Sequence, residues 1–143
     1  MDGLRLLLVD DELEYRETLL KRMRKRQVSV AGVKSGEEAL GYLEGHPTDV
    51  VVLDVRMPGM DGIQTLQAIK ERHPLIEVIM LTGHASVEVA IRGMELGAFD
   101  YLMKPMDIDE ILYKAQDAYK KKLLHEKRMQ RKKGVEPEQI KDR

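Results

Sequence analysis

Short, unbroken apolar runs, each followed at once by a charged residue, constrain this chain more than any other feature. In chain order the charged residues after these runs are Asp10 with Asp11, then Asp54, then Lys104. The first two runs are rich in Val and Leu, which is typical of strands buried on both faces of a parallel sheet. A charge placed directly after such a strand lies at its carboxyl end, which is where ligands bind in an open α/β sheet.

The carboxyl ends of parallel strands meet at one edge of a sheet, so we expect Asp10, Asp11, Asp54 and Lys104 to share one crevice. Three neighbouring carboxylates repel one another when all are ionised. A divalent cation together with phosphate oxygens would relieve that repulsion. The sequence therefore predicts a metal and phosphate site.

Strand-like and helix-like patterns alternate five times along the chain, which predicts βαβ units and a parallel sheet. Right-handed crossovers with short loops favour a doubly wound α/β fold of three layers, with five strands in the order 2-1-3-4-5. The expected strands are 4–9, 28–31, 50–53, 76–81 and 99–103. Helical spacing predicts that Leu13 in the first helix points toward the core, and that four apolar residues of the fourth helix do so too: Val87, Ala90, Ile91 and Met94.

Composition narrows the class of protein. A chain of 143 residues suits one domain, and it has no cysteine, which fits a reducing compartment. Its apolar runs are strand-sized, well short of the roughly 20 residues that cross a bilayer. No basic-then-apolar leader opens the sequence. We therefore expect a cytoplasmic protein without a membrane partner.

Charge divides the chain into two parts. Positions 117–143 hold 10 basic and 5 acidic residues, whereas the preceding part is acidic. We predict a domain at 1–121 and a basic helical extension or linker at 122–143. The sequence has no aromatic residue after Tyr119. Because stacking on bases uses aromatic side chains, we expect no direct nucleic-acid binding by this chain.

The sequence resembles the receiver domain of two-component response regulators over positions 4 to about 120. Four elements carry the resemblance: Val9-Asp10-Asp11-Glu12, Asp54-Val55-Arg56-Met57-Pro58-Gly59-Met60-Asp61-Gly62, Leu81-Thr82-Gly83-His84, and Gly97-Ala98-Phe99-Asp100-Tyr101-Leu102-Met103-Lys104-Pro105. Their order and spacing together are specific, although each alone is weak. The second and fourth elements are most similar to receivers of the nitrogen-regulation type, the activators that work with sigma-54. Such receivers usually precede an ATPase domain and a DNA-binding domain.

The resemblance implies that Asp54 accepts a phosphoryl group from the phosphohistidine of a sensor histidine kinase. It implies Mg²⁺ held by the carboxylates of Asp11 and Asp54 and the backbone carbonyl of Arg56, with Asp10 acting through metal-bound water. Lys104 would pair with a phosphoryl oxygen, and its bond to the following proline would be cis.

The remaining phosphoryl oxygens would be taken by the Thr82 hydroxyl and the backbone N–H of Gly83, again by resemblance. Thr82 and Tyr101 would then act as the switch pair, with Tyr101 turning inward after phosphorylation. The face that would change comprises the fourth helix, fifth strand and fifth helix, around Val89, Tyr101 and Tyr113. That face would support a homodimer or a downstream output domain. Such a chain is not an enzyme in its own right, but assists its own phosphorylation and dephosphorylation.

Other interpretations are weaker. A phosphatase of the haloacid-dehalogenase type needs two aspartates separated by one residue, whereas Asp10 and Asp11 are adjacent. A flavodoxin-like flavin module needs hydroxyls and glycine after the first strand, where this chain has carboxylates. A receiver that docks without being phosphorylated remains the main alternative. Single residues have simpler explanations too: Glu12 as a favourable first-turn charge, and Asp61 as a helix N-cap.

Overall fold

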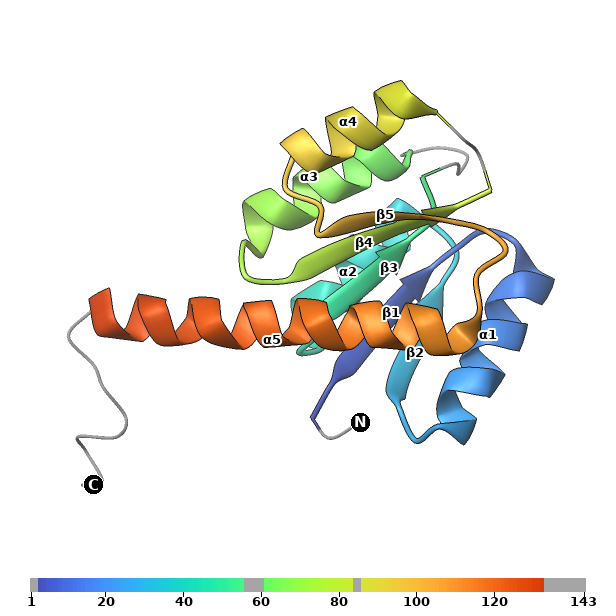
Figure 1. The fold of residues 1–143 in the computed structure, drawn as a ribbon, viewed down its shortest axis with the longest axis horizontal. Helices are drawn as coiled ribbons and strands as arrows, with labels where there is room; N and C mark the ends of the chain where they lie inside the picture. The colour runs from blue at the N-terminus through green and yellow to red at the C-terminus, as the bar shows by residue number, and fades with distance from the viewer. Residues whose placement is uncertain (1–2, 56–60, 84–85, 133–143) are drawn as a thin grey trace.

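Five parallel strands form one sheet, and a helix follows each strand, in the computed structural model (Figure 1). The structure describes residues 3–55, 61–83 and 86–132. The strands are β1 Arg5–Val9, β2 Ser29–Val33, β3 Val50–Leu53, β4 Glu77–Thr82 and β5 Asp100–Met103. The helices are α1 Leu13–Lys25, α2 Gly36–Gly45, α3 Gly62–Arg72, α4 Val87–Glu95 and α5 Ile108–Lys132. The strand order β2-β1-β3-β4-β5 confirms the predicted doubly wound topology.

Two layers of helices cover the sheet, α1 and α5 on one face and α2 and α3 on the other, with α4 beside α3 (Figure 1). Successive residues of a strand point to opposite faces. Accordingly Leu6 and Leu8 of β1 pack in the cluster under α1 and α5, whereas Leu7 and Val9 pack in the cluster under α2 and α3. All four residues of β3 are buried, as expected for the central strand. The sequence pattern therefore predicts correctly that β1 and β3 are buried on both faces.

Local hydrogen bonds explain where several helices begin. The Ser35 hydroxyl oxygen accepts from the backbone N–H of Glu38 at the start of α2, and Ser86 does the same for Val89 at the start of α4. Asp61 caps α3 through a reciprocal capping box with Gln64, so its expected role as an N-cap is confirmed. These side-chain caps therefore set the first residues of α2, α3 and α4.

Strand β2 begins one residue later and ends two residues later than predicted. Val28 is buried, but its N–H donates to the Met23 carbonyl and so closes the end of α1. Gly32 and Val33 instead continue the ladder, pairing with Leu8 and Val9 of β1. Pairing with the neighbouring strand, rather than hydrophobicity, sets the strand's end.

The predicted inward stripes of α1 and α4 are partly wrong. Leu13 is 61% exposed, because α1 packs through Leu19, Leu20 and Met23 farther along. In α4 three of the four apolar residues predicted to point inward are exposed, Val87 at 76%, Ile91 at 54% and Met94 at 46%, and Ala90 is half-buried.

Helix α4 packs instead through Val89, Gly93 and Leu96. A Cβ at Gly93 would overlap the Met80 side chain, so this glycine permits the close approach of α4 to β4. Close packing at Gly93, rather than the apolar spacing, therefore sets which face of α4 lies against the sheet.

Helix α5 is the longest element, with 25 residues, and it extends beyond the sheet (Figure 1). Its first turns bury Ile108, Ile111, Leu112 and Ala115. The helix continues without a break across positions 121 and 122. None of the described helices is long and apolar enough to span a bilayer.

Candidate functional site

The carboxyl ends of four strands bring together four of the residues singled out in the sequence. Asp10 follows β1, Asp54 follows β3, Thr82 ends β4 and Lys104 follows β5. The backbone between these positions is fixed by the ladder, since the N–H of Asp54 donates to the Val9 carbonyl at 2.9 Å and the N–H of Lys104 to the Thr82 carbonyl at 2.8 Å. Asp10, Asp54 and Thr82 are buried. Three of the four charged residues predicted to share a crevice, Asp10, Asp54 and Lys104, therefore meet at this edge of the sheet.

The Lys104 ammonium is the centre of this site. Its Nζ lies 2.8 Å from an Asp10 oxygen, 2.7 Å from a Glu12 oxygen and 3.4 Å from an Asp54 oxygen. Burial opposes the charge on Lys104, but hydrogen bonds to Asp10 and Glu12 outweigh it and raise the pKa of this lysine. The ammonium is therefore charged at neutral pH and serves as the counter-charge of the acidic cluster.

Burial also raises the pKa of Asp10, with the Asp54 charge adding to the effect and the hydrogen bond from Lys104 opposing it. The side chain of Asp10 is held in place by a second contact, because its Oδ1 accepts from the backbone N–H of Glu12 at 2.9 Å. A carboxylate that is this costly to ionise gains most from an additional cation.

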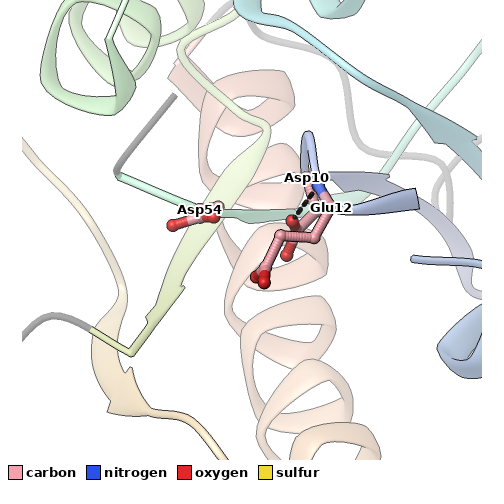
Figure 2. Close-up of side chains that lie close together, drawn as sticks. All are labelled: Asp10, Glu12 and Asp54. Atoms are coloured by element: carbon pink, nitrogen blue, oxygen red, sulfur yellow. Dashed lines mark hydrogen bonds between the residues drawn. The ribbon is translucent and has the colours of Figure 1, made fainter. Parts of the chain in front are cut away.

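Three carboxylates could hold a metal ion. Oxygens of Asp10, Glu12 and Asp54 all lie within 4.8 Å of one another. Figure 2 shows the three side chains near one another, Asp10 and Glu12 from the short loop between β1 and α1 and Asp54 from the residue that follows β3. Oxygen donors of this kind suit Mg²⁺, and an ammonium already lies among them. The donor set therefore fits a small divalent cation.

The cluster differs from the ligand set that the resemblance implies. Asp11 is exposed and is not one of the three carboxylates that the described structure groups together. Arg56 and His84 lie outside the described residues, so the ligand role of the Arg56 carbonyl stays a prediction.

The other predicted site residues border the crevice. Gly83 is exposed and lies against Lys104, since a Cβ built on Gly83 would be 3.9 Å from the Lys104 Cβ. The bond between Lys104 and Pro105 is cis, as expected. Tyr101 on β5 is half-buried and packs against the cluster under α2 and α3.

Two site residues were missed by the sequence reasoning. Glu12 was interpreted only as a helix-terminal charge, yet its carboxylate binds Lys104. Tyr15, on the first turn of α1, places its ring centroid 4.4 Å from the Lys104 Nζ. Their positions two and five residues after Asp10 were the available signal. It was insufficient because the direction of both side chains depends on where α1 begins.

Comparisons with known proteins agree with this geometry. A family model described as the response regulator receiver domain matches residues 6–116. The DNA-binding transcriptional regulator NtrC of Klebsiella pneumoniae is 43% identical over 103 residues, which are 72% of this chain and 22% of that protein. The transcriptional regulatory protein ZraR of Escherichia coli is 40% identical over 110 residues, 77% of this chain and 25% of that protein. The chain thus spans about a quarter of the length of these curated relatives.

Solved structures are similar as well. A response regulator receiver domain protein from Clostridium thermocellum has a TM-score of 0.79 at 32% identity, over 85% of this chain and 98% of that one. The receiver domain of NtrX from Brucella abortus has a TM-score of 0.75 at 28% identity, over 80% of this chain and 98% of that one.

Proposed function

Because the chain belongs to the response regulator receiver domain family, we propose that it receives a phosphoryl group on Asp54 and thereby switches a surface that controls a partner. One observation carries the proposal. The buried carboxylate of Asp54 faces a charged lysine and two further carboxylates at the carboxyl edge of a parallel sheet. This arrangement offers an oxygen nucleophile, a cation for phosphoryl oxygens and ligands for a metal.

The donor would be the phosphohistidine of a sensor histidine kinase. A carboxylate oxygen of Asp54 forms a bond to phosphorus while the bond from phosphorus to the histidine nitrogen breaks, and that nitrogen keeps the electron pair and takes a proton. Phosphoryl transfer depends mainly on positioning and charge neutralisation. In this proposal Lys104 neutralises one phosphoryl oxygen, and the Thr82 hydroxyl and the Gly83 backbone N–H donate to the others. The chain would be a phosphoacceptor that assists this transfer and the later hydrolysis of its acyl phosphate, in which water takes the phosphoryl group as inorganic phosphate and the Asp54 carboxylate is restored, rather than an enzyme acting on a separate substrate.

Mg²⁺ would supply charge neutralisation between the donor and the carboxylates. We propose that Asp54 holds it together with Asp10, Asp11 and the Arg56 carbonyl, and that Glu12 is near enough to contribute. Calorimetric titration of Asp10→Asn, Asp11→Asn and Glu12→Gln with Mg²⁺ would separate ligands from bystanders. Unchanged affinity in Asp11→Asn would remove Asp11 from the ligand set.

The decisive experiment is intact mass spectrometry after treatment with acetyl phosphate and Mg²⁺. One phosphoryl group should be added, and Asp54→Asn or chelation should abolish the addition. Asp61→Asn is the matched control, because asparagine also caps a helix and Asp61 lies outside the acidic cluster. If the unaltered chain gains no phosphoryl group, a receiver that docks without phosphorylation becomes the better interpretation.

Phosphorylation of Asp54 would change the surface formed by α4, β5 and α5. We propose that Thr82 and Tyr101 couple Asp54 to this face, and that a second copy or a downstream output domain binds there. The exposed apolar side chains of α4 support the proposal, since water-exposed Val87, Ile91 and Met94 provide contact area for a partner. Amide shifts around Val89, Tyr101 and Tyr113 should change on phosphorylation, and Thr82→Ala should weaken that change.

A further inference from the structure

Tyr15 encloses the Lys104 ammonium on the side of α1. The ammonium lies 4.4 Å from the centre of the tyrosine ring, and the Lys104 side chain is only 11% exposed. Carboxylates from the β1–α1 loop and β3 take the other contacts described above. A cation over an aromatic face is attracted to it, and the attraction is stronger when water is excluded. Lys104 is therefore held by two kinds of contact, one ionic and one aromatic.

Within the described part of the chain, the hydroxyl of Tyr15 makes no hydrogen bond that would help to hold Lys104. It is buried and has no hydrogen-bond partner among the described residues. Leaving a buried hydroxyl unpaired costs free energy, so the position is not explained by that group. Burial also raises the pKa of Tyr15, although Lys104 opposes the shift, so the ring stays neutral at physiological pH. Lys104 consequently contacts an uncharged ring face.

The ionic contacts of Lys104 hold its ammonium closer to Asp10 and Glu12 than to Asp54, the proposed phosphoryl acceptor. Its distances to Asp10 and Glu12 are shorter than the 3.4 Å to Asp54. If a divalent cation takes the carboxylates of Asp10 and Glu12, the lysine loses these two partners. The ring face of Tyr15 would stay in contact with Lys104, because it has no carboxylate that a divalent cation could take.

We propose that Tyr15 is a positioning residue, whose ring face keeps the Lys104 ammonium directed into the crevice while a phosphoryl group is transferred to Asp54. This inference rests on the proposed function. Loss of the ring should slow phosphorylation by about fivefold, in keeping with the modest strength of a partly buried cation–π contact.

The rate test compares ring-bearing with ring-free variants. Tyr15→Met keeps most of the side-chain volume without an aromatic face, and Tyr15→Leu is a second such variant in case the first folds poorly. Both should be phosphorylated about fivefold more slowly by acetyl phosphate with Mg²⁺. Tyr15→Phe keeps the ring and should recover the rate. Tyr42→Leu is the matched control, because Tyr42 stacks on His46 away from Lys104.

A second measurement is independent of phosphorylation. Ring-current shifts of the Lys104 side-chain resonances should be present in the unaltered chain and in Tyr15→Phe, and absent in Tyr15→Met. Equal rates in Tyr15→Met and the unaltered chain would overturn the proposal. A Tyr15→Phe variant as slow as Tyr15→Met would overturn it too, because the hydroxyl would then be the working group. If no variant is phosphorylated but the ring-current shifts are present, the proposed function fails while the contact stands.

Discussion

Lys104 shows how one side chain can hold an acidic site together before any ligand binds. Asp10 and Asp54 are buried, and buried charges are tolerated when they are paired. The three carboxylates around Lys104 come from two separate strand ends, so the lysine also ties β5 to β1 and β3. The same contacts put this ammonium in competition with any cation that the carboxylates bind.

Replacement of Lys104 by methionine should therefore have two opposite effects. The free energy of unfolding without metal should fall by about 3 kcal/mol, since buried carboxylates lose their partner. Mg²⁺ affinity should rise, because the competing ammonium is gone. Urea unfolding with and without Mg²⁺, together with calorimetric titration, measures both. Weaker Mg²⁺ binding in Lys104→Met would contradict the competition.

At the scale of elements, α4 and α5 depart most from what hydrophobic spacing alone suggests. Helix α4 leaves Val87, Ile91 and Met94 exposed, although their spacing predicts that they point inward. Helix α5 buries a lysine, and Lys122 binds Asp49 at 3.0 Å and Glu126 at 2.6 Å. The departure in α5 follows from the buried carboxylate of Asp49, which pairs with Lys122, and the departure in α4 follows from the close approach of Gly93 to Met80.

Two isoleucines on neighbouring helices provide a test of the α4 packing. Ile91→Ala should change the free energy of unfolding by at most about 0.5 kcal/mol, because Ile91 is exposed. Ile69→Ala on α3 should cost about 2–5 kcal/mol, since Ile69 is fully buried. Urea denaturation of both variants makes the comparison. Similar large losses would mean that Ile91 is buried in solution.

Asp49 should make stability depend on acid pH. It precedes β3 and is 1% exposed; burial opposes its ionisation, but hydrogen bonds from Arg5 and Lys122 prevail and lower its pKa. A lowered pKa stabilises the fold fully above the unfolded value of about 3.9 and stops doing so as pH falls through the folded value.

Asp49→Asn should therefore lose about 3 kcal/mol at pH 7, and its stability should fall less than that of the parent when the pH drops below about 4. Asp109→Asn is the control, because its exposed pair with Arg26 contributes at most about 1 kcal/mol at either pH. Thermal melts across the acid range give the result. If the stability of Asp49→Asn and that of the parent fell in parallel with pH, Asp49 would not be the cause of the acid dependence.

At the scale of the whole molecule, sequence patterns predict the topology and most of the crevice. Strand order follows from alternating patterns, and Asp10, Asp54, Thr82 and Lys104 meet because each occupies a strand end, a property encoded locally. Glu12 and Tyr15 could not be placed, since their directions depend on the start of α1. The orientation of α4 depended on Gly93 meeting Met80, a contact between distant segments that no local period reveals.

Truncation locates the functional end of the folded unit. A chain ending at Lys121 should still be phosphorylated, because the crevice lies at the opposite edge of the sheet from Asp49. It should melt at a lower temperature than a chain ending at Arg128, which keeps the Lys122 pairs with Asp49 and Glu126. Calorimetry of the two chains tests this. Equal melting temperatures would mean that the Lys122 ion pairs add no stability.

The length of α5 has a mechanical consequence. At about 1.5 Å per residue its axis measures roughly 37 Å, and the Lys121 and Lys122 contacts to Glu77 and Asp49 fasten it at the amino edge of the sheet. The helical turns beyond these two contacts have no strand beneath them (Figure 1). Any small change in the angle between α5 and the sheet would therefore displace the far end of the helix by more than it displaces the part that lies on the sheet.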